Sequence, residues 1–372
     1  MYVRDPILKD IEVNGIETKI IDTQEFQRLR HINQLGFTNL VYPSANSTRF
    51  EHSLGVMRIT KDLAAAAGFK ADEELALAGL LHDIGHTPFS HQTEHVFMQH
   101  LGKTHERLGY DIIKNSPISD IASENGISLK KILSYFNGVG KGKIITGSLG
   151  SDRIDYLQRD AYHTGVASGV ADYTRIRNKL AFFNGVPAVY RDGTDGAESM
   201  LVARYYMFSA VYFHHASVIA DGMFSRALAH AIESGEVDPR EAARFTDGQL
   251  TYALSKSKAG SKLATMVAER RLFKRVYYFD GIDGPGSVHE IDSALGKAGF
   301  EPDDYVAELR QFKGGDDDVA VIGKDGKKLG NLSSISPLFN TLLAMLKKRR
   351  IIVVACDRKD VDRAKKAVSK AL

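Results

Sequence analysis

The first 22 residues alternate apolar and polar positions in the manner of paired strands. Ile11–Val13 and Ile16–Thr18 stand on either side of the pair Asn14-Gly15. An Asn-Gly pair accepts the positive φ angles of a tight turn between two antiparallel strands. The pattern therefore predicts an N-terminal β-hairpin within residues 1–22.

From Glu25 onward the period becomes helical. Apolar residues recur at every third position, namely Phe26, Leu29, Ile32 and Leu35. This spacing predicts an amphipathic helix. A second helix is expected to begin after Asn46 or Ser47, which can cap its free N–H groups, and to end at Gly68.

A third helix is almost entirely apolar and ends in polar residues. Its acidic first turn favours the positive end of the helix dipole. Residues 75–81 form the apolar body, and the pair His82-Asp83 follows. Gly85 and Pro88 then break the helical period. The pattern predicts a helix that delivers an imidazole and a carboxylate to an irregular loop.

Two later stretches also have a helical period. In SDRIDYLQRDAYHTG, one polar stripe is formed by Asp152, Tyr156, Arg159 and His163. Exposed helices favour Lys and Glu over Tyr and His, so this stripe indicates a helix that lines a polar cavity. The aromatic-rich stretch 200–221 predicts a further helix that lies mostly in the core.

Past residue 245 short apolar runs alternate with stretches rich in Lys and Asp. The runs are RRLFKRVYYFD, VAVIGKDGKKLG and RRIIVVACD, and a helix is expected at Arg358–Leu372. Alternating strands and helices predict a small α/β domain. We therefore expect a helical domain at residues 1–245 and a small α/β domain at residues 246–372.

Composition excludes several classes of protein. The 372 residues suffice for a large core and two domains, and the hydrophobic share of 43% is ordinary for a soluble globular protein. Cys356 stands alone, which excludes an intramolecular disulfide and a thiolate-cluster metal site. The opening residues lack a signal-peptide core and no apolar stretch could span a bilayer, so we expect a cytoplasmic protein that is not bound to membranes. A net charge of +3 does not by itself indicate nucleic-acid binding.

Histidine is concentrated in one part of the chain. Seven of the 13 histidines lie between His52 and His105. Neutral imidazoles together with ionised carboxylates suit a divalent transition metal. A buried, hydrogen-bonded structural pair is the more common meaning of a lone His-Asp dipeptide. The surrounding histidines favour a metal site here.

Three motifs resemble a known family. Glu51-His52, His82-Asp83 and Asp152 resemble the H…HD…D signature of the HD-domain metal-dependent phosphohydrolases. The strings RFEHSLG, LLHDIGHTPFSH and SDRIDYLQRDAYHTG look like its deoxynucleoside triphosphate triphosphohydrolase branch. That branch includes bacterial dGTPase-like enzymes and the vertebrate SAM-and-HD-domain protein. The resemblance covers residues 26–215 and implies a mainly α fold: a helical HD core, an N-terminal hairpin and a small C-terminal α/β region.

The resemblance also implies roles for the polar residues. One divalent ion (Fe, Mn, Zn, Ni or Mg) is expected on four ligands: His52, His82, Asp83 and Asp152. The catalytic positions it implies are His86, His91, His105, Glu94 and Glu106. Of these, His91 is the expected general acid or nucleophile-assisting group, because Glu94 one turn later can raise its pKa by charge pairing.

The expected reaction converts a deoxynucleoside triphosphate and water to deoxynucleoside and tripolyphosphate. The substrate-binding positions implied by the resemblance are Gln34, Leu35, Arg49, Tyr156, Asp160, Arg204, Tyr212 and His214. Two of them, Arg49 and Arg204, are candidate phosphate clamps because a guanidinium donates two parallel hydrogen bonds. A nucleotide effector is expected near Asp22, Arg28 and Arg30, and a homo-oligomer (dimer or tetramer) by analogy with the family.

Two alternative functions remain open at this stage. The first keeps the fold but changes the substrate to nucleoside monophosphates or cyclic nucleotides. The second is a non-catalytic nucleotide- or nucleic-acid-binding protein with a vestigial metal site. The second predicts a missing metal ligand, and the sequence has all four.

Overall fold

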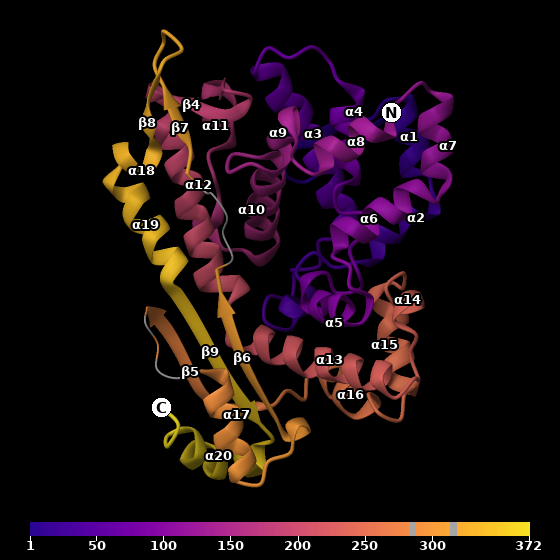
Figure 1. Cartoon of the computed structure of the whole chain (residues 1–372), viewed down its shortest axis with the longest axis vertical. Helices are drawn as coiled ribbons and strands as arrows, with labels where there is room; N and C mark the ends of the chain where they lie inside the picture. The colour runs from indigo at the N-terminus through magenta and orange to yellow at the C-terminus, as the bar shows by residue number, and fades with distance from the viewer. Residues whose placement is uncertain (283, 285–286, 313–317) are drawn as a thin grey trace.

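The computed structural model describes residues 1–282, 284, 287–312 and 318–372. These residues are mainly helical and also form three small β-sheets. In Figure 1 the indigo and magenta helices of the first half gather at the upper right, and the orange and yellow C-terminal elements run down the left side to the bottom. No helix in the described part of the chain is both long and apolar enough to cross a bilayer. The predicted fold class is confirmed.

The N-terminal hairpin lies earlier in the chain than predicted. Its antiparallel strands are β1 (Tyr2–Asp5) and β2 (Lys9–Glu12), so the predicted strand positions are wrong. Asn14 caps helix α1 (Gly15–Ile21): its side chain accepts the N–H of Glu17, whose carboxylate accepts the N–H of Asn14. This capping box satisfies two N–H groups of the helix end, which a hairpin turn at Asn-Gly would not do.

The helix predicted from Glu25 is broken into short pieces. Helix α2 (Gln24–Gln27) is followed by two 3-10 helices, Arg28–His31 and Gly36–Leu40, with irregular chain between them. In that gap the N–H of Gln34 donates to the carbonyl of Ser47. This hydrogen bond ties the irregular stretch to the residues just before the helix that begins at Arg49. The four apolar residues are still buried, since a three-residue spacing also suits 3-10 turns.

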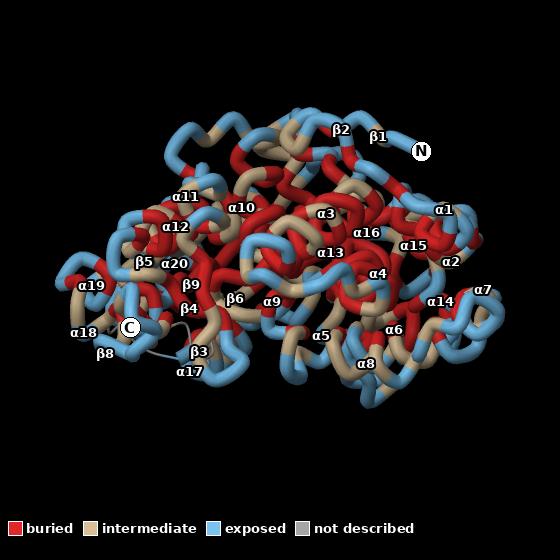
Figure 2. The backbone as a smooth tube through the Cα atoms, turned by 90° about the horizontal axis from the view of Figure 1, so that it is seen from above, coloured by how far each residue is buried: buried red, intermediate tan, exposed pale blue. Residues whose placement is uncertain are grey.

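Three packed helices form the centre of the molecule. They are α3 (Arg49–Ala66), α4 (Glu73–Leu81) and α10 (Ser151–Thr164), and each was predicted. The cap of α3 is Thr48, with Glu51 completing a capping box, so it lies one residue later than expected. Figure 2 shows buried backbone concentrated in these central helices and exposed backbone at the periphery.

Shorter helices, all within residues 91–146, pack around these three central helices. They are α5 (His91–Leu101), α6 (His105–Lys114), α7 (Pro117–Glu124), α8 (Leu129–Phe136) and α9 (Lys143–Thr146). The Gly- and Lys-rich stretch 136–147 contains α9 and a 3-10 turn at Gly140–Gly142.

The aromatic-rich stretch is interrupted. Helix α12 (Thr194–Met207) runs into a π-helical turn at Phe208–Tyr212, and α13 (His215–Glu233) begins only after a break. The His214 side chain caps α13 by accepting the N–H of Ala216, so the prediction of one helix across 200–221 is wrong. The other helices of this region are α11 (Tyr173–Lys179), α14 (Pro239–Ala242), α15 (Asp247–Lys256) and α16 (Ser261–Ala268).

A four-stranded sheet joins distant parts of the sequence. Its strands lie in the order β3 (Leu180–Phe183), β4 (Val186–Tyr190), β7 (Ala320–Ile322) and β8 (Lys328–Asn331). The pair β4–β7 is parallel and the other two pairs are antiparallel. This sheet takes strands from both sides of residue 245, so the domain boundary at that position stays a prediction that the sheet does not favour.

A three-stranded antiparallel sheet forms the C-terminal lobe. Its order is β5 (Lys274–Ile282), β9 (Arg349–Cys356) and β6 (Tyr305–Gln311). Side chains of β9 alternate between two faces: one face packs under α17 (Val288–Lys297) and α20 (Val361–Val368), and the other packs on α13. Two further helices, α18 (Leu332–Ile335) and α19 (Pro337–Lys348), pack beside β8 and α12 instead of on this sheet. The final helix is shorter than predicted because a 3-10 turn precedes it.

Replacing Asn14 tests the capping box at the start of α1. We expect Asn14→Ala to lower the free energy of unfolding by about 1 kcal/mol, and Asn14→Ser to cost much less because its hydroxyl can still accept the N–H of residue 17. Urea unfolding measures both. Equal losses in the two variants would contradict the capping role.

Asp221 makes stability depend on pH. It is 8% exposed, and burial raises the pKa of its carboxyl to about 7 against the opposing charge of Arg310. A carboxyl whose pKa is raised in the folded state contributes most below its unfolded pKa of about 3.9, and that contribution is lost as the pH rises to 7.

We therefore expect the wild-type protein to lose about 2–3 kcal/mol of this contribution between about pH 5 and pH 8, at 1.4 kcal/mol per pKa unit. The variant Asp221→Asn cannot ionise at this position. Its stability relative to wild type, measured by urea unfolding, should rise over that interval. A constant difference between the two proteins would show that Asp221 titrates normally.

Candidate metal and catalytic site

Four polar side chains from three helices converge at one point. His52 projects from the first turns of α3, His82 and Asp83 follow the end of α4, and Asp152 lies at the start of α10. The Nε2 atom of His52 lies 3.2 Å from Asp152 Oδ1 and 3.4 Å from Asp83 Oδ2. The Nε2 atom of His82 lies 3.2 Å from Asp83 Oδ1. The structure thus brings together all four predicted metal ligands.

The imidazoles of His52 and His82 bind protein groups through Nδ1 and leave Nε2 available to an ion. His52 Nδ1 lies 2.8 Å from Asp155 Oδ2, and His82 Nδ1 lies 2.8 Å from the Gly79 carbonyl. Both Nε2 atoms are buried and have no hydrogen-bond partner. In metal sites the second ring nitrogen of a ligating histidine is held by a carboxylate or carbonyl in this way. The donor set of imidazole and carboxylate therefore fits a divalent cation.

The electrostatics of these carboxylates also suit a cation. Burial alone raises the pKa of Asp83, but the charges of His82 and Arg49 outweigh it and hold that pKa well below its usual range. Burial lowers the pKa of His52, yet the adjacent carboxylates of Asp152 and Asp155 outweigh burial and raise that pKa to about 9. A cation must therefore compete with a proton for His52, which makes metal affinity fall as the pH falls.

A buried chain of charges supports His52 from behind. Asp155 accepts two hydrogen bonds from Arg159, of 2.8 and 2.9 Å, and Arg159 also donates to Asp5 at 2.8 Å. A Cβ atom at Gly55 would overlap the Asp155 carboxylate, so only glycine allows this approach of α10 to α3. Arg159 was predicted to line the cavity with Asp152. The Arg159 guanidinium lies in this buried network and not in the cavity lining, which corrects that prediction.

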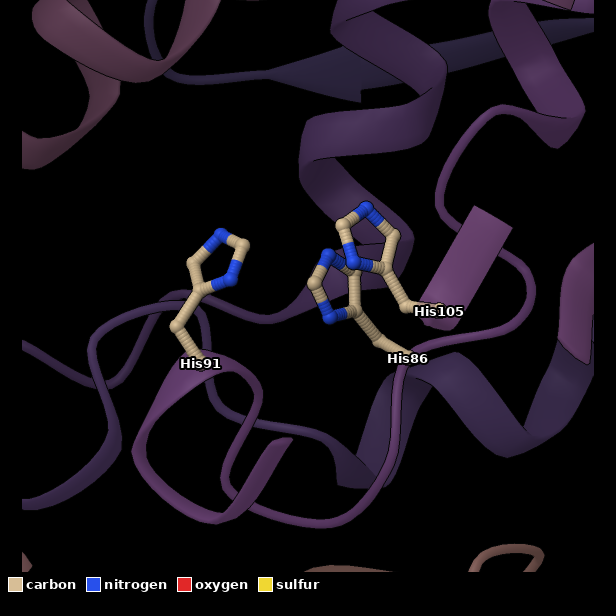
Figure 3. A group of neighbouring side chains, drawn as sticks. All are labelled: His86, His91 and His105. Atoms are coloured by element: carbon tan, nitrogen blue, oxygen red, sulfur yellow. The ribbon is translucent and has the colours of Figure 1, made fainter. Parts of the chain in front are cut away.

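Three further histidines form a second cluster beside the first (Figure 3). The rings of His86 and His105 stack with centroids 4.0 Å apart and an interplanar angle of 12°. His91 lies edge-on to His86, with centroids 4.8 Å apart. Gly85 makes this possible, because a Cβ there would overlap the backbone at the start of α6, where His105 begins the helix.

Ring geometry assigns different chemistry to the two clusters. The lone pair of an imidazole nitrogen lies in the ring plane, so the nearly parallel rings of His86 and His105 cannot both direct lone pairs at one ion. The carboxylate of Glu94 instead holds His91 Nδ1 at 2.9 Å and His105 Nδ1 at 2.5 Å. A carboxylate that fixes one ring nitrogen leaves the other to exchange protons with a substrate. The second cluster therefore suits acid–base chemistry better than chelation.

The two rings of the stack carry different charge. Burial lowers the pKa of His105, but its hydrogen bond to Glu94 outweighs this and raises it. Burial, Arg49 and His105 together lower the pKa of His86 well below its usual value. The pKa values of the two stacked rings are therefore shifted in opposite directions, which favours the cationic form of His105 and the neutral form of His86.

Both clusters open into one cavity of about 830 Å³. The predicted site residues on its walls are Gln34, Leu35, Arg49, His82, Asp83, His86, His91, His105, Glu106, Asp152, Tyr156, Asp160 and Tyr212. His52 lies just behind this wall and is fully buried, and Glu94 reaches the cavity through the histidines it holds. The π-helical turn places Phe208 and Tyr212, four residues apart, on the same wall.

Other predicted site residues lie elsewhere. Arg204 stacks on Phe312, 4.3 Å from the ring centroid, and lines a separate small cavity. His214 stacks on His215 outside the cavity walls. Neither residue is part of the cavity lining: Arg204 turns onto Phe312, and the break before α13 turns His214 away. Their roles in substrate binding stay predictions.

The predicted effector residues do not form a common pocket in the structure. Arg28 donates to the backbone carbonyls of His86, Ala243, Arg244 and Phe245. Arg30 lies over the ring of Phe50, 3.6 Å from its centroid, and Asp22 is exposed at the end of α1. The guanidinium of Arg28 is thus engaged in joining the HD loop to the chain before α15.

Sequence reasoning missed several residues of the site. Asp155 was overlooked, although its spacing of three residues from Asp152 places both on adjacent faces of α10. Four cavity residues had no local signal in the sequence, namely Gln92, Phe136, Asn137 and Thr146. Phe136 and Thr146 belong to short helices that only tertiary packing brings to the cavity.

Changing Asp155 tests whether this chain positions the metal ligand. We expect Asp155→Asn to weaken divalent-metal affinity about 10–100-fold, because His52 loses its charged partner. Titration of the metal-free protein against a chromophoric chelator measures the affinity. The exposed Asp120→Asn provides a control of the same chemistry, and circular dichroism checks the fold.

A substitution at Asp5, the last member of the hydrogen-bonded series that begins at His52, separates an effect on ligand positioning from direct damage to the metal site. Asp5→Asn leaves His52 and Asp155 untouched and should weaken metal affinity less than Asp155→Asn. Unchanged metal affinity in Asp155→Asn would contradict the positioning role.

The same motifs occur in related sequences. Residues 49–160 match the HD domain family, and residues 171–372 match the family described as HD associated region. An uncharacterised protein of Methanocaldococcus jannaschii is 42% identical over 286 residues, which are 75% of this chain and 60% of that protein. The deoxynucleoside triphosphate triphosphohydrolase SAMHD1 homolog of Dictyostelium discoideum is 27% identical over 74% of this chain and 59% of its own length. This chain therefore spans about 60% of these two relatives.

Solved structures show the same architecture. A hypothetical protein from Aquifex aeolicus has a TM-score of 0.82 at 30% identity and covers 99% of both chains. A phosphohydrolase from Bacteroides thetaiotaomicron has a TM-score of 0.80 at 25% identity, covering 96% of this chain and 100% of its own. Together with the matching family regions and the HD ligand geometry, these similarities show that the chain belongs to the HD-domain phosphohydrolase family.

Proposed function

We propose that this protein hydrolyses deoxynucleoside triphosphates to deoxynucleoside and tripolyphosphate. The observation that supports this most directly is the single cavity, which joins the metal-ligand cluster, the histidine cluster and two tyrosines. Similarity to the SAMHD1 homolog of Dictyostelium discoideum agrees with it. A volume of about 830 Å³ lies within the range of small-molecule sites in proteins.

A divalent ion on His52, His82, Asp83 and Asp152 would supply positive charge and polarise a phosphate oxygen. Arg49 adds a second positive charge within the same wall. Its guanidinium is held by Asp83 at 2.5 Å and by the Ser90 hydroxyl at 2.9 Å, so its position is fixed before a substrate arrives. Fixed positive groups are effective because they need no reorganisation when phosphate charge changes.

Acid–base chemistry is assigned to the histidine cluster. The imidazole of His91 is 61% exposed and its Nδ1 is held by Glu94, so its Nε2 is available to the cavity. We assign it the proton transfer to the leaving deoxyribose oxygen. The hydrogen bond to Glu94 raises the pKa of His105 beside it, which favours the cationic form that stabilises phosphate charge. Glu106 lies 3.5 Å from the Nε2 atom of His105.

The far wall of the cavity is assigned to the sugar. The rings of Tyr156 and Tyr212 stand edge to face at 6.4 Å, and Tyr212 donates a 2.7 Å hydrogen bond to Asp160. Burial raises the pKa of Asp160 to about 7. Gln34 points a buried, unpartnered side-chain oxygen into the same region, next to Leu35. A wall of tyrosine rings beneath the sugar excludes a 2′-hydroxyl and so favours deoxynucleotides.

The alternative substrates keep the same family. Nucleoside monophosphates or cyclic nucleotides need fewer cationic contacts than a triphosphate, and this cavity offers Arg49, Arg153 and the histidine cluster. The observation favours the longer phosphate chain. The complete ligand set likewise favours an enzyme over a non-catalytic nucleotide-binding protein.

Regulation and assembly are part of the proposal. An effector nucleotide that used Arg28 would have to displace its backbone carbonyl partners and so move the HD loop next to His86. This contact gives a direct route from an effector to the site. We propose that such an effector acts in a homo-oligomer, where Asp22 and Arg30 are exposed to a partner.

A product assay tests the reaction. Purified protein with Mn²⁺ or Mg²⁺ is incubated with each deoxynucleoside triphosphate, alone and with dGTP or GTP, and products are separated by ion exchange. We expect deoxynucleoside and tripolyphosphate, lost at least about 1,000-fold in Asp83→Ala, because metal charge supplies several kcal/mol. Light scattering on the same samples measures any effector-dependent change in oligomer size.

Two outcomes would overturn parts of this proposal. Intact triphosphates alongside cleaved monophosphates or cyclic nucleotides would place the substrate elsewhere within the family. If dGTP and GTP change neither the cleavage rate nor the oligomer size, the effector proposal is wrong and the proposed reaction still stands.

A further inference from the structure

The HD loop, residues 84–90, is held in place by the other half of the chain. It ends in the turn Phe89-Ser90, which leads directly into α5. The N–H of Phe89 donates a 2.7 Å hydrogen bond to the carboxylate of Asp247, which lies 158 residues later in the sequence, at the start of α15. Helix α14, just before this point, also contacts α5 (Figure 1). The position of the HD loop therefore depends on the chain that leads into α15.

The turn Phe89-Ser90 has a strained backbone. Phe89 has a φ of 59°, and Ser90 has a φ of 55° with a ψ of −129°, a conformation that turns reserve largely for Gly, Asn and Asp. Strained residues of this kind persist only where the surrounding contacts hold them, and they cluster at active sites. The Phe89 ring makes one such contact, since it stacks on Phe37 with centroids 4.4 Å apart. The hydrogen bond to Asp247 is another.

The Asp247 carboxylate does not cap its own helix. Thr246 caps α15, and Gln249 completes that capping box. Asp247 is 8% exposed and accepts N–H groups from two other segments, that of Asn33 at 2.8 Å and that of Phe89 at 2.7 Å. A buried carboxylate is costly unless such donors satisfy it. The two segments that it joins therefore explain why a carboxylate is buried at this position.

The strained turn places the Ser90 hydroxyl against Arg49. This hydroxyl donates to the carbonyl of Asn33 at 2.8 Å and accepts a 2.9 Å hydrogen bond from Nε of Arg49. The same guanidinium donates from its Nη1 to Asp83. Arg49 lines the cavity that contains the metal ligands. A series of hydrogen bonds therefore runs from Asp247 through the strained turn to a cation in the cavity wall.

A second contact holds the middle of the HD loop. Arg28 donates from Nη2 to the carbonyl of His86 at 2.6 Å and from Nε to the carbonyl of Arg244 at 2.8 Å. The chain at 243–247 is thus joined to the loop at two points. The opposite charges of Arg28 and Asp247 favour this arrangement.

We propose that Asp247 is a positioning residue for the phosphate-binding side of the cavity. By accepting the N–H of Phe89 it holds the strained turn, and the hydroxyl of Ser90 then fixes the guanidinium of Arg49. Asp247 lies outside the cavity lining, so it acts through these residues and does not touch the substrate. This role rests on the proposed function, because it takes Arg49 as a phosphate contact.

Hydrogen exchange of the full chain, read by mass spectrometry at residue resolution, tests this series without a ligand. Asp247→Asn keeps the shape of the side chain but offers one acceptor oxygen to two N–H groups. We expect faster exchange at the amides of Phe89 and Asn33. The amide of Arg49 should follow, because it donates to the carbonyl of Ile32 next to Asn33. Unchanged exchange at Phe89, or a change that does not reach Arg49, would overturn the proposal.

A matched control is available in the same region. The exposed Asp238 accepts the N–H of Arg240 at 2.8 Å at the start of α14, away from the HD loop. Asp238→Asn makes the same chemical change and should leave exchange at Phe89 and Arg49 as in wild type. Equal effects of the two substitutions on these amides would contradict the specific role of Asp247.

Calorimetry with inorganic tripolyphosphate in Mg²⁺ buffer tests whether the cavity depends on this series. Burial raises the pKa of Asp247 to about 6, so the carboxylate is ionised at pH 8. We expect Asp247→Asn to weaken the dissociation constant about tenfold at unchanged stoichiometry, because a displaced guanidinium loses directed hydrogen bonds to phosphate. Partial unfolding would instead lower the stoichiometry and leave the dissociation constant unchanged, and that result would overturn the proposal.

A double-mutant cycle tests Ser90 as the relay. Ser90→Ala removes the hydroxyl that contacts Arg49 and should weaken tripolyphosphate binding by a similar factor. Adding Asp247→Asn should then cost no more than about threefold further, because two changes in one hydrogen-bonded series are not additive. Full additivity would overturn the relay. If wild type binds no tripolyphosphate, the proposed function is contradicted, and hydrogen exchange at Arg49 alone decides the role of Asp247.

Discussion

Burial of charge at the junction of α3 and α10 is the constraint on which the rest of the structure depends. His52 is fully buried beside Asp83 and Asp155. A buried charge without partners is strongly destabilising. The chain His52–Asp155–Arg159–Asp5 supplies those partners, and it ends in the N-terminal hairpin. The hairpin therefore belongs to the support of the metal site as much as to the fold.

The same packing separates two kinds of chemistry within one cavity. Side chains that hold Nδ1 atoms leave the Nε2 atoms of His52 and His82 unpartnered toward the predicted cation position. Glu94 holds His91 and His105 in a different geometry, with the latter stacked on His86. Close approach of α6 at Gly85 makes the second arrangement possible. Acid–base groups and metal ligands thus lie side by side without competing for one ion.

Local sequence was enough to predict the metal ligands and the helices that carry them. The apolar run before His82-Asp83 and the cap before Arg49 are short-range signals, and both helices form where expected. Long-range effects account for the errors. The pair Asn14-Gly15 supports both a turn and a helix cap, and only the helix that follows decides between them.

Site residues outside the three motifs show the same contrast between local signals and long-range contacts. Arg159 has a helical spacing that suits the cavity stripe, but two carboxylates in the core bind its guanidinium and hold it away from the cavity. Arg204 stacks on Phe312 instead of reaching the cavity wall, and His214 caps α13 because the chain breaks after the π-helical turn. Neither feature has a signal that a periodic pattern could reveal.

X-ray absorption fine structure of the manganese- or iron-loaded protein tests the metal centre most directly. The structure predicts one ion for each chain and outer-shell scattering from two imidazoles, with nitrogen and oxygen ligands at roughly 2.0–2.2 Å. Replacing His86 should leave this spectrum unchanged, and replacing His82 should remove one imidazole. Scattering from three imidazoles that depends on His86, His91 and His105 would contradict the assignment and place the ion in the stacked cluster.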